Sequence, residues 1–187
     1  MKVQQLKKVL KASYRSGKQK IDNYDINPKL SGTRVQVYYD PSTKKAIVAH
    51  RGTKKTSIHD IGTDIKMLFG FESGNRFKHA KKIQRKAENL YGRENITTVG
   101  HSLGGRIAEK VGKKSAKIVT YNKAATPKSI LQKTPPKQTD IVAKGDVVSI
   151  LTKLQKHSNP VVVAPGSYNL LKTHSMSKLK YIKDKNI

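Results

Sequence analysis

The spacing of apolar residues changes abruptly near residue 100. Residues 96–99 form a short, mostly β-branched run, which is typical of a buried strand. Immediately afterwards, apolar side chains recur at helical spacing, at Leu103, Ile107, Ala108 and Val111. Between the two patterns, Gly100 and Gly104 lie two residues before and after Ser102. The sequence therefore predicts a tight strand-to-helix turn with Ser102 at its apex.

Similar patterns predict the rest of a sheet. Strands are expected at residues 34–39, 45–50, 116–121, 140–143 and 161–164, and a helix at residues 75–91 precedes the run at 96–99. A turn signal at residues 40–43 predicts that the first two strands form a hairpin, with residues 34–39 half-buried at the sheet edge. Strands that alternate with helices are typical of a parallel sheet. We therefore predict one α/β domain over residues 1–187, with a mostly parallel central sheet flanked by helices.

Two of the predicted helices carry an apolar stripe between lysines. Residues 1–20 are predicted to form a basic amphipathic helix with Val3, Leu6, Leu10 and Tyr14 on one side. Because this stripe is short and holds neither tryptophan nor phenylalanine, packing on the domain is favoured over docking on a membrane surface. The helix at residues 75–91 is predicted to start at an Asn75 cap and to bury Phe77, Ala80, Ile83, Ala87, Leu90 and Tyr91.

Charge sets the chain apart from an ordinary small domain. The sequence holds 39 lysines and arginines against 12 aspartates and glutamates, which gives a formal net charge of +27. The basic residues are scattered along the whole chain, so we expect a cationic surface around an ordinary core. Such a surface is attracted to anionic membranes and, non-specifically, to nucleic acid.

Several classes of chemistry are excluded by composition. The chain has no cysteine, so it forms neither disulfides nor thiolate metal sites. The histidines show no spacing typical of a metal site, and we expect neither a metal nor an organic cofactor. Lysines interrupt the first 14 residues, and no later apolar run reaches the length of a membrane span. We therefore expect an intracellular protein without a signal peptide, either soluble or peripheral to membranes.

The predicted turn at Ser102 has the chemistry of a nucleophile elbow. Such a turn holds the serine hydroxyl out from the sheet in a strained backbone conformation, and the flanking glycines relieve the crowding. The first amides of the following helix point to the same place, where the positive end of the helix dipole favours an oxyanion. A glycine-rich turn can also cradle a phosphate, so the interpretation depends on partner residues elsewhere.

Partner motifs occur in the order found in one hydrolase family. Residues 47–53 read Ile-Val-Ala-His-Arg-Gly-Thr, residues 60–64 read Asp-Ile-Gly-Thr-Asp, and residues 100–105 read Gly-His-Ser-Leu-Gly-Gly. Together they resemble the class 3 lipase family of α/β-hydrolases, whose members hydrolyse acylglycerols, phospholipids or other esters. The resemblance implies a compact α/β-hydrolase fold and an oxyanion hole made by the backbone amides of Thr53 and Leu103.

The resemblance also implies a lid. In this family the segment between the oxyanion loop and the next helix covers the site or contacts lipid. The corresponding residues here hold Met67, Leu68, Phe69 and Phe71, and exposed apolar residues of this kind are typical of a binding surface. We therefore expect residues 65–75 to form a short lid or one wall of an acyl pocket, with a plain loop that covers the core as the alternative.

In an α/β-hydrolase the acid and the histidine of the triad follow the serine in the chain. Two aspartates compete for the acid. Asp140 begins its predicted strand, whereas Asp146 follows the carboxyl end, where ligand chemistry occurs in such sheets. Two histidines come after the acid. His157 precedes the strand at 161–164 and His174 follows it, so His174 is favoured, with His157 as the alternative.

The predicted mechanism is acyl transfer through a serine. His174 takes the proton of Ser102, Asp146 orients the imidazole, and the Thr53 and Leu103 amides stabilise the oxyanion. A phospholipase and a triacylglycerol lipase both fit the sequence. The cationic surface adds the phospholipase as a candidate, because such a surface gathers at anionic phospholipid, but charge does not decide between the two. The alternative function is a catalytically inactive hydrolase fold that binds nucleic acid or anionic membranes, and packaging in a virion is one hypothesis for its location.

Overall fold

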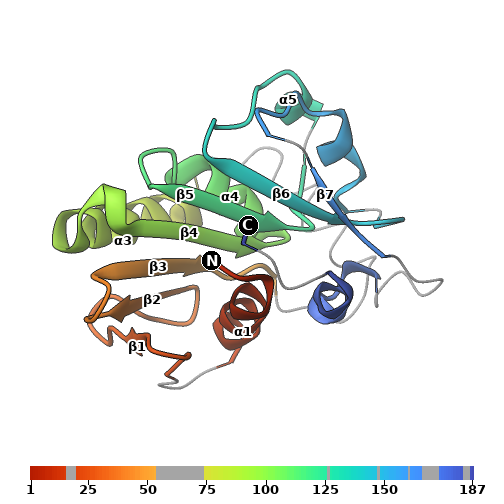
Figure 1. Cartoon of the computed structure of the whole chain (residues 1–187). Coiled ribbons are helices and arrows are strands. Elements are labelled where there is room, and N and C mark those ends of the chain that lie inside the picture. Colours follow the sequence, from red (N-terminus) through yellow and green to blue (C-terminus); the bar gives the residue numbers. More distant parts are fainter. Residues whose placement is uncertain are drawn as a thin grey trace.

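A central sheet organises the molecule (Figure 1). The computed structural model describes residues 1–15, 20–53, 74–125, 127–146, 148–159, 161–165, 173–182 and 186–187. Its described strands are β1 (Asp25–Ile26), β2 (Val35–Asp40), β3 (Lys45–His50), β4 (Ile96–His101), β5 (Lys117–Tyr121), β6 (Gln138–Ala143) and β7 (Val162–Ala164). They lie side by side in sequence order, antiparallel from β1 to β3 and parallel from β3 to β7. The predicted α/β class with a mostly parallel sheet is confirmed.

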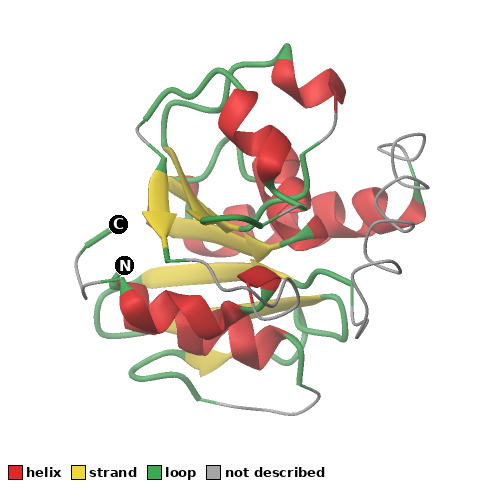
Figure 2. Ribbon diagram, turned by 90° about the vertical axis from the view of Figure 1, so that its right-hand side faces the viewer, coloured by secondary structure: helices red, strands yellow, loops and turns green. Residues whose placement is uncertain are grey.

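Helices cover both faces of this sheet. The described helices are α1 (Val3–Ser13), α3 (Asn75–Tyr91), α4 (Leu103–Val111) and α5 (Pro127–Ile130), and the 3-10 turns are η1 (Arg93–Asn95), η2 (Ile150–Leu154) and η3 (Met176–Tyr181). Helix α1 and turn η3 lie together on one face, and α3 and α4 lie on the other (Figures 1 and 2).

Alternation along the strands explains why an apolar core lies on each face of the sheet. In β3, Ile47 and Ala49 belong to the core that contains α1 and η3. Their neighbours Ala46 and Val48 belong to the core under α3 and α4. Successive side chains of a strand point to opposite faces, so a strand that is apolar throughout buries both of them. This pattern places β3 in the interior of the sheet.

Helix α1 packs its apolar stripe onto the sheet. Val3, Leu6, Val9 and Leu10 are fully buried in the same core as Leu179 of η3. The helix ends at Ser13, short of the predicted boundary at residue 20, because the apolar spacing ends at Tyr14. Residues 16–19 lie outside the described residues, and Lys20 is not helical. Within the described ranges, no helix combines the length and the apolar character that a membrane span requires.

Three details differ from the sequence expectations. Residues 34–39 do not form the sheet edge, because the two-residue strand β1 pairs outside β2, a strand too short to leave a pattern in the sequence. Leu90 is 60% exposed, whereas Gln84 is buried on the same helix through hydrogen bonds to Thr98 and Ser115. The cap of α3 is Gly74, and Asn75 is already helical.

Parallel strands bring distant segments to one edge. The carboxyl ends of β3, β4, β5 and β6 are followed by residues 51–53, Ser102, Asn122 and the segment with Asp146. Strand β7 is the last strand before His174. This is the edge where parallel α/β sheets hold their ligands. All of the predicted catalytic residues therefore come from segments that leave the sheet at this edge.

Candidate active site

Ser102 occupies a strained turn between β4 and α4. It is the N-cap of α4, with φ 56° and ψ −127°, and its side chain is buried. A positive φ at a residue other than glycine costs on the order of 1–3 kcal/mol and requires support from the surrounding structure. A Cβ at Gly100 would lie 2.1 Å from the carbonyl oxygen of Gly104, and a Cβ at Gly104 would lie 2.0 Å from that of His50. Both positions therefore require glycine.

Backbone hydrogen bonds hold this elbow against β5. The Ser102 amide donates to the Tyr121 carbonyl at 3.0 Å, and the Ala124 amide donates to the Ser102 carbonyl at 3.1 Å. Leu103 is the first residue of α4, and the first amides of a helix have no partner within it. The Leu103 amide therefore has no hydrogen-bond partner within its own helix.

The predicted oxyanion loop lies directly against the elbow. A Cβ at Gly52 would lie 2.6 Å from the His101 carbonyl oxygen and 3.2 Å from Ser102 Cβ. The Arg76 guanidinium at the start of α3 donates to the carbonyls of Arg51 and Gly52, the latter at 3.1 Å. These contacts hold the segment that precedes the half-buried Thr53.

The described part of this region stops at Thr53 and resumes at Gly74. The motif at residues 60–64 therefore lies outside the described residues. The predicted lid at residues 65–75 also lies outside them, apart from its last two positions.

Asp146 and His174 form a buried pair. Asp146 Oδ1 lies 2.9 Å from His174 Nδ1, and Asp146 Oδ2 accepts from the amide and hydroxyl of Ser149. Burial by itself raises the pKa of Asp146, but the hydrogen bonds from His174 and Ser149 outweigh it and hold the pKa below its usual range. A carboxylate at Nδ1 leaves Nε2 as the basic nitrogen. His174 Nε2 is buried and has no hydrogen-bond partner among the described residues.

Side-chain donors hold the segment that carries His174. Asn122 Nδ2 donates to the carbonyls of Thr173 and His174, at 3.0 and 3.1 Å. The Tyr121 hydroxyl donates to the Ser175 carbonyl at 3.1 Å. Asn122 has φ 43°, and its Oδ1 accepts from the Ala143 amide at 2.8 Å. Asn122 thus links β5, β6 and the histidine segment.

Sequence reasoning assigned no role to Asn122. The signal that could have found it is an asparagine directly after a buried parallel strand, where the side chain can bond to neighbouring backbones and where a positive φ is tolerated.

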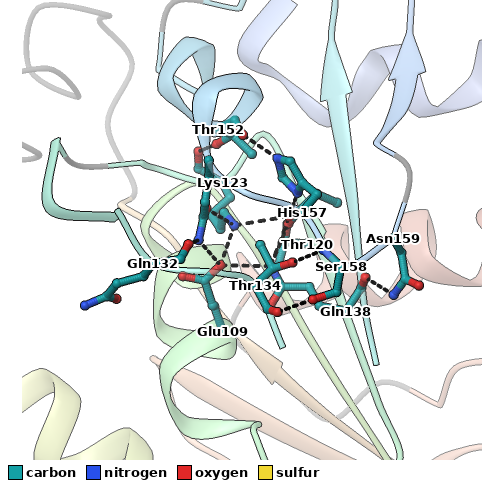
Figure 3. Close-up of polar contacts among 12 residues, drawn as sticks. Glu109, Thr120, Lys123, Gln132, Thr134, Gln138, Thr152, His157, Ser158 and Asn159 are labelled. Carbon is teal, nitrogen blue, oxygen red and sulfur yellow. Dashed lines mark hydrogen bonds and ion pairs between the residues drawn. The ribbon is translucent and has the colours of Figure 1, made fainter. Parts of the chain in front are cut away.

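The alternative histidine lies in a different environment (Figure 3). His157 Nδ1 lies 3.1 Å from Asp140 Oδ2, and its Nε2 bonds to the Thr152 carbonyl. The two aspartates and the two histidines left open by the sequence are therefore paired as Asp146 with His174 and Asp140 with His157. Both nitrogens of His157 are engaged, so this ring has no nitrogen available to activate a serine.

Asp140 and His157 belong to a buried ionic network centred on Lys123 (Figure 3). Lys123 is fully buried and donates to Glu109, to Asp140 Oδ2 at 3.2 Å and to Gln155 Oε1 at 2.9 Å. Burial by itself raises the pKa of Asp140. The hydrogen bond with His157 and the charge of Lys123 outweigh burial and lower this pKa to about 2. We call these residues the Lys123 network: Glu109, Lys123, Asp140, Gln155 and His157.

Sequence reasoning did not find the Lys123 network. A lysine after β5 is unremarkable in a chain with 39 basic residues, and Glu109 reads as an exposed helix position.

Other histidines have structural surroundings. His50 is buried, and burial lowers its pKa to about 4. His101 is also buried, and burial followed by the nearby His174 lowers its pKa to about 3. His79 is exposed on α3, and His59 lies outside the described residues. Within the described segments, no group of three or more histidine or acidic side chains could hold a metal ion.

Comparison with known families identifies the type of domain. The family model of the Tle-like phospholipase domain, described as phospholipase-like, matches residues 9–164. The chain belongs to this family. The predicted relation to lipase-type α/β-hydrolases is confirmed, and the chain is by family a lipid ester hydrolase. The match includes Thr53, Ser102 and Asp146 and ends before His174. Among curated proteins, none matches the sequence.

Solved structures with a similar fold are distant in sequence. A predicted CIB-like hydrolase from Thermoplasma acidophilum is 15% identical, with a TM-score of 0.46 over 77% of this chain and 86% of that one. EstE1, a thermostable carboxylesterase cloned from a metagenomic library, is 14% identical, with a TM-score of 0.45 over 88% and 85%. The Rhizomucor miehei lipase propeptide complex is 13% identical, with a TM-score of 0.44 over 79% and 61%.

Proposed function

We propose that this protein is a serine esterase that hydrolyses carboxylic esters of phospholipids. The observation that carries the proposal is the buried Asp146–His174 pair, whose Nε2 is unengaged among the described residues. It comes from the same sheet edge as the strained Ser102, whose turn is packed against residues 50–52. A nucleophile, a base with an orienting acid and a loop of backbone amides are the parts that acyl transfer requires.

Each residue has a defined part in the proposed reaction. His174 Nε2 removes the Ser102 proton as Oγ attacks the ester carbonyl carbon, and Asp146 stabilises the imidazolium. The amides of Thr53 and Leu103 donate to the oxyanion of the tetrahedral intermediate. His174 then protonates the departing alcohol, which leaves an acyl group on Ser102. Water, deprotonated by His174, attacks this acyl-enzyme, and His174 returns the proton to Ser102 Oγ as the fatty acid leaves.

Phospholipids are favoured over triacylglycerols for two reasons. The family description is phospholipase-like, and the net charge of +27 attracts the chain to anionic phospholipid surfaces. A neutral triacylglycerol offers no phosphate to such a surface. The proposal therefore predicts faster turnover on vesicles of phosphatidylglycerol than on emulsified trioleoylglycerol.

A serine-directed probe tests the mechanism. We expect a fluorophosphonate to label the wild-type protein and the control variant Ser42→Ala, whose serine lies in the β2–β3 turn. Ser102→Ala should lose both labelling and release of fatty acid from phosphatidylglycerol. Labelling of Ser102→Ala at the wild-type rate would refute the proposed nucleophile, and turnover confined to trioleoylglycerol would refute the substrate class.

A second function, binding of phosphate-bearing surfaces, is favoured by a cationic groove between α3 and α4. Its volume is about 520 Å³, and its lining includes Phe77 and the Arg93–Glu88 ion pair. Further cations in the lining include Lys78, Lys81, Arg85, Lys113 and Lys114. In the described part of the chain, none of these five cations has a carboxylate partner. We propose that the groove binds anionic phospholipid headgroups and so holds the enzyme at its substrate.

A variant with reversed charges in the groove is compared with a variant that carries an equal change of charge elsewhere on the surface. Lys78→Glu with Lys81→Glu is compared with the control Lys29→Glu with Lys137→Glu, all four being exposed lysines. We expect the groove variant alone to lose most of its sedimentation with phosphatidylglycerol vesicles at physiological salt. Equal losses in both variants, or a groove-dependent affinity for single-stranded DNA but not for vesicles, would contradict the proposal.

A further inference from the structure

Tyr14 connects helix α1 to two segments of the candidate active site, which are the turn at Ser102 and the loop before Thr53. It is the C-cap residue of α1, and its hydroxyl lies 2.8 Å from His101 Nδ1. The backbone amide of Gly52 donates to the same hydroxyl, and a Cβ at Gly52 would lie 2.4 Å from it. One hydroxyl therefore touches the residue before Ser102 and the loop before Thr53.

His101 continues this connection to the base. Its Nε2 lies 2.8 Å from the carbonyl oxygen of His174, and the two rings are 4.9 Å apart between centroids. A carbonyl oxygen only accepts hydrogen bonds, so Nε2 must carry the hydrogen. The ring is neutral because burial lowers its pKa to about 3, and a neutral imidazole has one N–H. Nδ1 is therefore an acceptor, and Tyr14 must be its donor.

The Tyr14 hydrogen bond thus selects one tautomer of His101. With the hydrogen on Nδ1 instead, Nε2 would turn a lone pair towards the His174 carbonyl oxygen, and the two acceptors would repel each other. Burial also raises the pKa of Tyr14, so its hydroxyl keeps the proton that it donates.

We propose that Tyr14 and His101 are positioning residues for the general base and the oxyanion loop. This inference rests on the proposed function, because it concerns the same site. Tyr14 accepts from Gly52 and donates to His101, which in turn donates to the backbone of His174. These hydrogen bonds thereby resist movement of the oxyanion loop relative to the segment that carries His174. The packing of α1 against η3, directly after His174, holds the same segment from its other end.

The substitution Tyr14→Phe removes the hydroxyl and keeps the ring. A displacement of about 1 Å can reduce turnover on the order of 100-fold, and we expect kcat to fall about 10- to 100-fold with KM nearly unchanged. The control is Tyr181→Phe on η3, whose side chain is exposed. It should match the wild-type protein in kcat. A wild-type kcat for Tyr14→Phe, or a loss of stability with no loss of kcat, would overturn the inference.

Two further measurements separate positioning from packing. Nitrogen-15 NMR should show His101 with its hydrogen on Nε2 in the wild-type protein and a mixture of tautomers in Tyr14→Phe. His101→Gln offers an amide donor to the His174 carbonyl, whereas His101→Leu offers none, so the glutamine variant should keep at least about tenfold more kcat. Equal activity of the two variants would overturn the inference even if Tyr14→Phe does not fold.

Failure of the positioning role can be distinguished from failure of the proposed function. If Ser102→Ala retains turnover, the serine mechanism is wrong. If Ser102→Ala is inactive but Tyr14→Phe has wild-type turnover and an unchanged His101 tautomer, only the positioning role is wrong.

Discussion

Two histidine–aspartate pairs lie in the described part of this protein, one with a buried histidine and one with a partly exposed histidine, and they differ in what surrounds the second nitrogen of the ring. His174 Nδ1 lies 2.9 Å from Asp146, and His157 Nδ1 lies 3.1 Å from Asp140. The Nε2 of His174 has no partner among the described residues, whereas that of His157 bonds to the Thr152 carbonyl. A hydrogen bond to an aspartate is therefore not enough to make a histidine a catalytic base. It also needs an unengaged nitrogen at the sheet edge that carries Ser102.

The two aspartates also differ in what they hold in place. Apart from His174, the polar contacts of Asp146 among the described residues are with the amide and hydroxyl of Ser149, and they serve to orient one imidazole. Asp140 bonds to the buried Lys123, to Thr120 and to Gln138 as well as to His157. The first pair is therefore expected to affect activity and the second to affect stability.

The largest effect is expected from the two histidines. His174→Ala should lower kcat by about 10⁵- to 10⁶-fold, because a triad without its base keeps little of its catalysis. His157→Ala should change kcat less than about tenfold, since it has no free nitrogen for Ser102. Initial rates on phosphatidylglycerol vesicles give both values. A larger loss in His157→Ala would reverse the assignment of the base.

The aspartates sharpen the same comparison. Asp146→Asn should lower kcat about 10⁴-fold, because an amide no longer holds His174 in the required tautomer. Asp140→Asn should instead lower the free energy of unfolding by about 3–5 kcal/mol, since it leaves a buried lysine without one of its charge partners. Urea denaturation and initial rates are measured on both variants. Equal losses of kcat would show that the two pairs are not functionally distinct.

Lys123 tests whether the second pair acts through its network. Lys123→Met should reduce the free energy of unfolding by about 3–5 kcal/mol, because it strands two buried carboxylates. Adding Glu109→Gln and Asp140→Asn should recover part of this loss. The exposed Lys137→Met is the control and should stay within about 0.5 kcal/mol of the wild-type protein. A further loss in the triple variant would argue against a charge-based role.

The dependence of stability on pH has two signs. His50 and His101 have pKa values lowered by burial to about 4 and about 3, against about 6.5 when unfolded. Between pH 6.5 and 4 the unfolded chain binds protons that the folded chain does not. The free energy of unfolding should therefore fall on acidification, by up to about 1.4 kcal/mol per pH unit for each histidine.

His157 acts in the opposite direction. Its pKa is raised, mainly by its hydrogen bond with Asp140, so its stabilisation is complete below pH 6.5 and is lost as pH rises through the raised pKa. His157→Gln should abolish this loss at higher pH and leave the acid limb unchanged. His79→Gln, at an exposed position, should alter neither limb in urea denaturation from pH 4 to 8. A free energy of unfolding that increases as the pH falls below 6.5 would contradict the burial of neutral histidines.

Much of the fold follows from local patterns. Strands β3, β4 and β5 are short runs rich in apolar and β-branched residues, and the change to helical spacing after Ser102 predicts the turn, because both patterns depend on neighbours in the chain. Strand β1 has only two residues, and Leu90 fits the apolar stripe of α3 yet is exposed, because contacts across the sheet decide both. Apart from its last two positions, the predicted lid lies outside the described residues.

The candidate site divides in the same way. Sequence order and the strand ends were enough to favour Asp146 and His174 as partners of Ser102, because parallel strands deliver their carboxyl ends to one edge. Only the tertiary structure decided which nitrogen is unengaged, which histidine is locked into the Lys123 network and that Tyr14 reaches the elbow. These contacts join residues far apart in the chain, and hydrogen bonding depends on where side chains meet in space, which no spacing along the sequence records.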